Sequence, residues 1–156
     1  MPTPDLTVGR LERQPIRMNV EIIDSSSEAE TSAVGQRLAE RLTAGAVVLL
    51  TGQLGAGKTA FVRGLALGLG ASQDDVSSPT FTLIQEYRGG RSTLHHVDLY
   101  RLTPIEIADL GLDELISGDD VVAIEWAERC PERPTDAIEV TIADAGEDRR
   151  RIEIRL

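Results

Sequence analysis

The sequence predicts a single α/β domain with three layers, built on a mixed, mainly parallel sheet with an antiparallel edge. Two continuous apolar runs, 46–51 and 121–124, are typical of strands that are covered on both faces. Segments with helical periodicity lie between the strands, as in folds with a parallel sheet. Glycines at 89–90 and at 146 separate strand-like segments and indicate antiparallel hairpins.

The elements up to residue 70 follow from periodicity and from capping signals. Ser27 and Glu30 have the spacing of a capping box, which places a helix start in this region. Apolar residues recur every four positions after it, and Gly45 ends that helix. A second helix follows a glycine-rich turn and ends at Gly70. The expected elements are a strand at 19–22, a helix at 28–43, a strand at 46–51 and a helix at 61–69.

The second half of the chain alternates short strands with short helices. Pro104 suits the first turn of a helix, and 112–116 adds another turn. The polar and apolar residues of the last two segments alternate, so these segments are expected to form a closing hairpin at a sheet edge. The expected strands are 81–87, 92–97, 121–124, 138–142 and 152–156.

The length and composition of the chain disfavour several classes of function. The chain has 156 residues, 41% of them hydrophobic, which is enough for one core. A formal net charge of -10 disfavours a broad surface for nucleic acid or anionic membranes, and a single cysteine, Cys130, excludes an internal disulfide or a cysteine-rich zinc site. No membrane span or signal peptide is visible, so a cytoplasmic protein is expected. Residues 1–18 hold three prolines without periodicity and are expected to form a flexible extension of a domain over 19–156.

Residues 52–59, Gly-Gln-Leu-Gly-Ala-Gly-Lys-Thr, satisfy the phosphate-loop pattern between a predicted strand and a predicted helix. In this P-loop NTPase-like arrangement, backbone N–H groups turn inward and the following helix points its positive end at the phosphates. Lys58 is the only lysine in the chain, which indicates that the site requires a compact ammonium to reach the outer phosphates. Thr59 offers its hydroxyl to Mg²⁺; the alternative is a plain glycine-rich turn. The predicted nucleotide contacts in this segment are Gly52, Gln53, Leu54, Gly55, Ala56, Gly57, Lys58, Thr59 and Ala60.

Two acidic residues close apolar strands and form a candidate catalytic pair with Lys58. Asp98 follows one strand and Glu125 another, so both are expected at the carboxyl edge of the sheet, near the phosphates. One of the two acids would bind Mg²⁺ and the other would orient water, and the sequence leaves open which does which. The alternative is that both are ordinary strand-end acids, solvated or capping a helix. His95 and His96 point to opposite faces of a strand, which disfavours a shared metal, and one of them is expected to be merely packed.

Two further features lie near the expected site. Ser78, Pro79 and Thr80 occupy a loop that could fold over the γ-phosphate, although local sequence alone favours an ordinary Ser-Pro turn. Trp126 directly follows Glu125, and it is either a core anchor or a lid or partner contact beside the site.

These motifs together resemble the TsaE (YjeE) family of small bacterial ATPases, which are needed for the threonylcarbamoyladenosine modification of tRNA. The resemblance rests on the phosphate loop, on Ser-Pro-Thr-Phe-Thr-Leu at 78–83, on His-Val-Asp-Leu-Tyr-Arg-Leu at 96–102 and on Ile-Glu-Trp at 124–126. It covers about 28–151. Departures are few: Ala127 stands where the family often has proline, and Phe81 where tyrosine is common.

The resemblance implies roles for individual residues and for partners. It implies that Thr59 and Glu125 hold Mg²⁺, that 55–59 binds the phosphates of ATP, that Asp98 assists catalysis and that 78–80 is a switch-type loop. Glu28 falls where the family approaches adenine, and Arg149 where the last hairpin closes on the nucleotide. The family acts on a TsaB–TsaD complex, so tRNA, at the adenosine next to the anticodon, would be reached only indirectly. Hydrolysis by the chain alone is expected to be slow.

Three other functions compete with this interpretation. A GTPase would need an Asn/Thr-Lys-x-Asp motif for guanine, and the only lysine is already in the phosphate loop. A small-molecule kinase would need an arginine-rich lid, for which Arg88, Arg91 and Arg101 are candidates. A nucleotide-stabilised interaction subunit would bind ATP without depending on hydrolysis.

Overall fold

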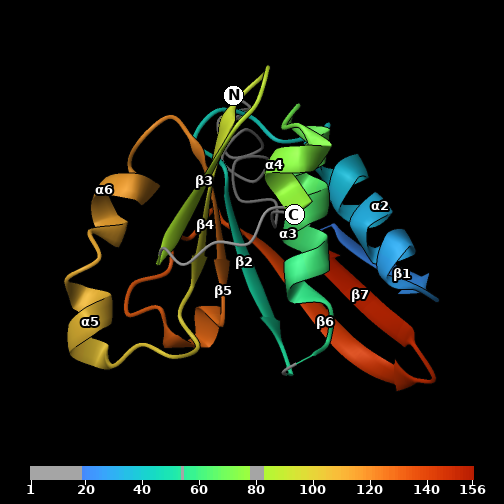
Figure 1. The fold of residues 1–156 in the computed structure, drawn as a ribbon. Helices are drawn as coiled ribbons and strands as arrows, with labels where there is room; N and C mark the ends of the chain where they lie inside the picture. Colours follow the sequence, from blue (N-terminus) through green and yellow to red (C-terminus); the bar gives the residue numbers. More distant parts are fainter. Residues whose placement is uncertain (1–18, 54, 78–82) are drawn as a thin grey trace, which may run out of the picture.

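A computed structural model describes residues 19–53, 55–77 and 83–156, and its core is one seven-stranded sheet (Figure 1). The order of the strands across the sheet is β1-β7-β6-β2-β5-β4-β3. The strands are β1 (Val20–Ser25), β2 (Val47–Gly52), β3 (Ile84–Arg88), β4 (Thr93–Asp98), β5 (Val121–Glu125), β6 (Ile138–Gly146) and β7 (Arg149–Arg155).

The sheet is mixed, with a parallel centre. Strands β6, β2, β5 and β4 run parallel, while β7, β1 and β3 pair antiparallel with their neighbours. This confirms the predicted fold class, with antiparallel pairing at both ends of the sheet. Because β2 lies between parallel neighbours, the loop that follows it opens at the carboxyl edge shared with β4 and β5.

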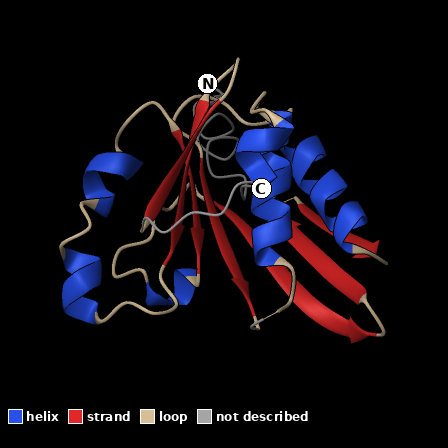
Figure 2. Ribbon diagram, in the orientation of Figure 1, coloured by secondary structure: helices blue, strands red, loops and turns tan. Residues whose placement is uncertain are grey.

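Helices cover both faces of the sheet (Figure 2). α2 (Glu28–Ala39) and α3 (Lys58–Gly68) lie on one face, with the short α4 (Gln73–Ser77) following them. α5 (Pro104–Ala108), α6 (Leu112–Ile116) and the 3-10 turn η1 (Ala127–Arg129) lie on the other. Within the described part of the chain, no helix combines the length and hydropathy of a membrane span.

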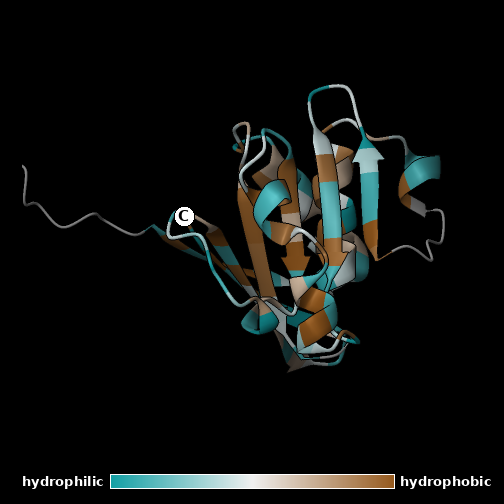
Figure 3. Ribbon diagram, turned by 90° about the vertical axis from the view of Figure 1, so that its left-hand side faces the viewer, coloured by the Kyte–Doolittle hydropathy of each residue, from teal (hydrophilic) through white to brown (hydrophobic). Residues whose placement is uncertain are grey.

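The core is divided between the two faces by strand alternation. In β2, Val48 and Leu50 pack toward α2 and α3, whereas Val47 and Leu49 pack toward α5 and α6. All five residues of β5 are buried. Figure 3 accordingly shows the central strands as mostly hydrophobic. The two apolar runs predicted to be covered on both faces are these two strands.

α2 and α3 approach each other closely because glycines line their contact. A Cβ on Gly64 would lie 2.8 Å from the Ser32 carbonyl carbon, and one on Gly68 would lie 2.6 Å from the Ala39 Cβ. Neither distance is compatible with a real side chain, so the two helix backbones can pack at this separation only with glycine at these positions. The phosphate-loop helix is thereby fixed against α2.

The structure corrects several boundaries predicted from sequence. The first helix ends at Ala39 rather than at residue 43. Its cap confirms the Ser27 signal, since Ser27 Oγ accepts a hydrogen bond from the Glu30 N–H at 3.1 Å; the Glu30 carboxylate accepts from the Ser26 N–H. The closing hairpin β6–β7 is not at an edge, because β1 pairs with β7 outside it. The predicted extension 1–18 lies outside the described residues.

Candidate active site

The loop between β2 and α3 has the backbone shape of an anion nest. Gly55 and Gly57 have φ values of 80° and 105°, which favour glycine, and a Cβ on Gly52 would overlap the Ile142 carbonyl oxygen. α3 begins at Lys58, so the free N–H groups of its first turn face the loop. The loop can therefore surround a phosphate with backbone donors. Leu54 lies outside the described residues.

Lys58 reaches across this loop. Its side chain is buried, and Nζ donates to the carbonyl oxygens of Gly52 at 2.6 Å and Gln53 at 2.9 Å. Burial holds the pKa of the Lys58 ammonium below its ordinary value. The carboxylates of Glu125, Glu128 and Asp98 oppose this shift without reversing it. The ammonium thus sits at the loop among negative groups, where phosphate oxygens could take the place of the two carbonyls.

Thr59 and Glu125 meet beside the loop. The Thr59 hydroxyl donates to both carboxylate oxygens of Glu125, at 3.2 Å and 3.1 Å. Glu125 ends β5 and is 3% exposed, so its carboxylate faces α3 and not solvent. This contact joins the start of α3 to Glu125, one of the two strand-end acids that the sequence placed near the phosphate loop.

The donor set fits Mg²⁺. Among the described residues no cluster of three His, Cys, Asp or Glu side chains could hold a metal by itself. A hydroxyl and one carboxylate converge here, both of them hard oxygen ligands, next to a loop whose backbone shape suits an anion. Mg²⁺ is commonly bound in this way, through one or two carboxylates together with substrate phosphates and water.

His96 is a site residue that the sequence reasoning missed. Its Nε2 hydrogen-bonds to Oε2 of Glu125, and its side chain is 10% exposed. His95 lies on the other face of β4, where its Nε2 is 2.9 Å from Oδ2 of Asp120. The alternation of the two histidines was predicted correctly, but the strand order needed to bring His96 to Glu125 was not visible. Among the described residues, the Glu125 carboxylate therefore has one partner on α3 and one on β4.

Asp98 lies at the same edge of the sheet with a different environment. It is in register with Glu125 on the neighbouring strand β5. Its carboxylate is exposed, and Oδ1 accepts a hydrogen bond from the Tyr100 N–H at 3.0 Å. The two acids thus meet at the predicted edge, one buried against the phosphate loop and one open to solvent.

Trp126 lies over the site. The Nζ atom of Lys58 is 4.3 Å from the centroid of the Trp126 ring, and the centroid of the Tyr100 ring is 4.7 Å from the same point. The Trp126 backbone is left-handed, with φ 59° and ψ 47°, which is uncommon for a bulky residue. The ring is half-buried, so it covers Lys58 without being sealed in the core.

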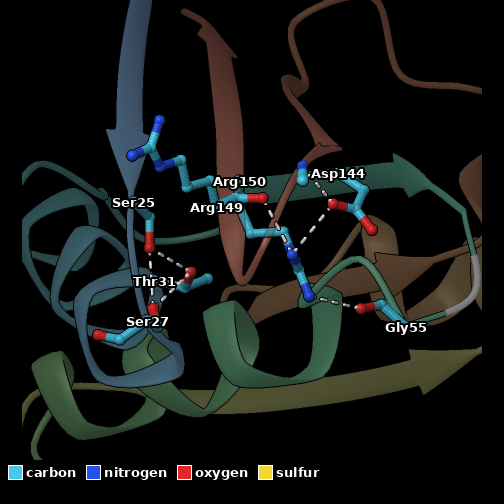
Figure 4. A network of polar contacts seen from close by, with 8 residues as sticks. Ser25, Ser27, Thr31, Gly55, Asp144, Arg149 and Arg150 are labelled. Atoms are coloured by element: carbon cyan, nitrogen blue, oxygen red, sulfur yellow. Dashed lines mark hydrogen bonds and ion pairs between the residues drawn. The ribbon is translucent and has the colours of Figure 1, made fainter.

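A hollow of about 370 Å³ extends from the loop toward α2 and the β6–β7 turn. Arg150 reaches it and donates to the Gly55 carbonyl oxygen at 3.3 Å (Figure 4). The Arg149 guanidinium, predicted to close on the nucleotide, points away from Gly55 in the same view. Strand alternation and a bulge near Asp144 decide which arginine faces the loop. Predicted contacts Glu28 and Ala60 both line this hollow, together with Ser27, Thr31, Gly57 and Asp148.

The predicted switch-type loop of Ser78, Pro79 and Thr80 lies outside the described residues, as does Phe81. The described chain resumes at Leu83, which is 55% exposed, and enters β3. The site therefore rests on Lys58, Thr59, Asp98, Glu125 and the newly found His96.

Comparison with known proteins gives one consistent result. The family model for "Threonylcarbamoyl adenosine biosynthesis protein TsaE" matches residues 25–152. The tRNA threonylcarbamoyladenosine biosynthesis protein TsaE of Nostoc sp. is 47% identical over 135 residues, covering 83% of this chain and 82% of the relative. The protein of that name from Bacillus subtilis is 44% identical over 124 residues, covering 79% and 77%. The crystal structure of Bacillus subtilis YdiB matches with a TM-score of 0.74 and 34% identity, covering 90% of this chain and 88% of that one.

Proposed function

The chain belongs to the TsaE family, and from this we propose that it binds ATP with Mg²⁺ and hydrolyses it in support of threonylcarbamoyladenosine biosynthesis on tRNA. The curated relatives carry the name of that biosynthesis. The observation that carries the ATPase proposal is the pair of hydrogen bonds from Thr59 to Glu125, beside Lys58. A phosphate loop alone would only bind nucleotide. A buried carboxylate that is hydrogen-bonded to the loop residue Thr59 supplies the second ligand of a hydrolytic metal site.

The proposed mechanism assigns a step to each residue. The loop N–H groups and Lys58 bind the β- and γ-phosphates and orient them. Thr59 and Glu125 would hold Mg²⁺, which when bound draws charge from the phosphate oxygens. Asp98, which is exposed at the same edge, orients the water that attacks the γ-phosphorus. The bond from the γ-phosphorus to the bridging oxygen breaks, and ADP leaves with that oxygen.

The acidic charge of the chain supports action through protein partners. With a formal net charge of -10, the chain as a whole is repelled by a tRNA backbone. We place it in the cytoplasm with TsaB and TsaD as partners, and tRNA is reached through that complex. In this arrangement the chain alone is a slow ATPase, because groups that complete the site come from the partners.

Phosphate release from ATP and from GTP tests this proposal, with and without the TsaB–TsaD pair and tRNA. Release should be selective for ATP, dependent on Mg²⁺ and stimulated by the partners. Glu125→Gln should abolish release while ATP binding persists. Transfer of phosphate to a small acceptor would instead indicate a kinase. Partner function that survives Glu125→Ala would indicate a subunit that only binds nucleotide.

A matched pair of variants tests the role of Lys58. Lys58→Ala should lose most ATP affinity and all turnover while the fold is retained, because the ammonium that would contact the outer phosphates is gone. Lys58→Arg keeps the charge, but a planar guanidinium does not fit the position between the Gly52 and Gln53 carbonyls. We expect it to recover little turnover. ATP binding measured by calorimetry, alongside phosphate release, separates the two effects; unchanged binding in Lys58→Ala would contradict the site.

A further inference from the structure

Two aromatic rings stack at the carboxyl edge of the sheet, beside the candidate active site. The ring centroids of Tyr100 and Trp126 are 4.7 Å apart, and the ring planes are inclined by 31°. Trp126 directly follows β5, and Tyr100 lies two residues beyond the end of β4. These strands are parallel neighbours with Asp98 level with Glu125, so their pairing brings the rings together just beyond the two acids. Aromatic pairs at this separation attract each other beyond the area that they bury.

The backbone that carries Tyr100 is fixed to both strand-end acids. The Leu99 N–H donates to the Glu125 carbonyl oxygen at 3.2 Å, which continues the pairing of β4 with β5. The Tyr100 N–H donates to Oδ1 of Asp98 at 3.0 Å. The Leu99 side chain is completely buried, which anchors this turn in the core. Tyr100, which is half-buried, therefore presents its ring to Trp126 from a held position.

The backbone conformation of Trp126 is unfavourable for a bulky residue, so contacts of its ring must fix it. With φ 59° and ψ 47°, Trp126 lies in the left-handed region, where Cβ crowds the following carbonyl oxygen. The ring is half-buried against the apolar cluster between the sheet and the helices α5 and α6. Its face lies over the Lys58 ammonium, which has to be free to bind phosphate. The apolar cluster and the Tyr100 ring are the contacts that do not depend on the nucleotide.

The Trp126 ring covers Lys58, whose charge has competing partners. Lys58 is 4% exposed, and three carboxylates lie near enough to act on its charge, those of Glu125, Glu128 and Asp98. An ammonium that turned to one of these carboxylates would no longer be directed at the phosphate loop. The face of an indole ring attracts a cation, so the ring favours the position in which the ammonium points into the loop. The ring also excludes water, in which charge interactions are weaker.

We propose that Tyr100 is a positioning residue of the candidate active site, and that its ring holds Trp126 over Lys58 so that the ammonium stays directed at the phosphate loop. Tyr100 acts through Trp126 and not on the substrate. Without Tyr100 the Lys58 charge is still present to bind phosphate, but it is less well directed at the transition state, so turnover should fall more than affinity. The effect on turnover rests on the proposed function, whereas the contact between the two rings does not.

A variant without the ring and a variant that keeps it test this contact in the absence of nucleotide. Trp126 is the only tryptophan in the chain, so the tryptophan fluorescence of the full-length protein reports on this ring alone. Tyr100→Leu should raise the rate constant for acrylamide quenching at least about twofold and lower the fluorescence anisotropy, because one side of the indole is uncovered. Tyr100→Phe keeps the ring and should match the wild type in both. Melting temperatures should be close to wild type, because Tyr100 is only half-buried and Leu99 still anchors the turn.

A cycle of single and double variants tests whether Tyr100 acts through Trp126. In steady-state phosphate release from ATP, Tyr100→Leu should lower kcat about tenfold and change KM by less than about threefold. Tyr100→Phe should recover most of the loss in kcat. Trp126→Leu should lose at least as much as Tyr100→Leu. The double variant should be no slower than Trp126→Leu, because it has no indole ring for Tyr100 to hold.

Wild-type quenching in Tyr100→Leu would overturn the proposal, whatever the turnover of that variant. A Tyr100→Phe variant as slow as Tyr100→Leu would also overturn it, since the hydroxyl group and not the ring would then matter. A double variant slower than Trp126→Leu would mean that Tyr100 acts by another route. Tyr100→Gln, a second variant without the ring, takes the place of Tyr100→Leu if the leucine variant does not fold, with the same outcomes. If the wild type releases no phosphate from ATP, the proposed function fails, and the fluorescence measurements still decide whether Tyr100 holds Trp126.

Discussion

On one face of the sheet, α2 and α3 lie backbone against backbone, whereas on the other α5 and α6 are separate five-residue helices. The first face carries the phosphate-loop helix and leaves no room for a methyl group at Gly64. The second leaves Ile105 exposed and a groove open. The comparison indicates that close packing of α2 and α3 holds Thr59 and Lys58 in place, whereas the opposite face is covered more loosely.

The largest expected effect is the loss of stability when a single methyl group is added between α2 and α3. Gly64→Ala would force α2 and α3 apart, because the new Cβ would lie 2.8 Å from the Ser32 carbonyl carbon and closer still to its oxygen. We expect the free energy of unfolding to fall by about 3 kcal/mol. Gly118→Ala, next to α6, places its Cβ at 3.4 Å from the Leu115 oxygen and should change stability by less than about 1 kcal/mol. Urea denaturation measures both, and equal losses would contradict the comparison.

The next largest expected effect is a loss of turnover on substitution of His96. The adjacent His95 faces the other side of the sheet. His96 is a positioning residue, because its hydrogen bond holds Oε2 of Glu125 while Thr59 approaches the same carboxylate. His96→Ala should lower turnover about 10–100-fold, with a smaller change in the KM for ATP. His96→Gln keeps an N–H donor at similar reach and should recover part of the loss.

His95 provides the control for that prediction. His95→Ala removes a contact to Asp120 on the α6 face and should leave turnover nearly unchanged. Steady-state phosphate release at saturating Mg²⁺ compares the variants. Equal losses in the two alanine variants, or no recovery with glutamine, would show that His96 supports only the fold.

These contacts mark what the sequence could and could not predict. The loop, the strand before it and the helix after it were predictable because a glycine pattern fixes the local backbone. Glu125 was predictable because an acid closed an apolar run. The partnership of His96 with Glu125 depends on β4 lying next to β5, and the choice of Arg150 over Arg149 depends on a bulge near Asp144. Such register and strand order come from long-range pairing, which periodicity along the chain does not encode.

Long-range strand pairing also explains why the closing hairpin was wrongly predicted to lie at the edge of the sheet. The last two strands alternate as a half-covered hairpin does, and alternation alone cannot reveal that β1, more than 100 residues earlier in the chain, pairs outside β7. The first helix was predicted four residues too long because apolar spacing continued to Leu42, which is buried in the core although it follows the helix. Packing, rather than helical structure, accounts for that side chain.

The smallest expected effect is the contribution of an ion pair to holding α2 against the sheet. Arg41, after α2, forms an exposed ion pair with Glu21 of β1, with 2.8 Å between Nη2 and Oε1. The hydrogen bond from Arg41 lowers the pKa of the Glu21 carboxyl, so the pair stabilises the fold above the ordinary carboxyl pKa, and this contribution is lost as the pH falls through the lowered value. Arg41→Ala should lower the free energy of unfolding at pH 7 by no more than about 0.5 kcal/mol, because solvent screens both groups. The difference from wild type should close in acid, below about pH 4. Denaturation at both pH values measures it, and a loss that matched Gly64→Ala would mean that charge, and not close packing, holds α2 against the sheet.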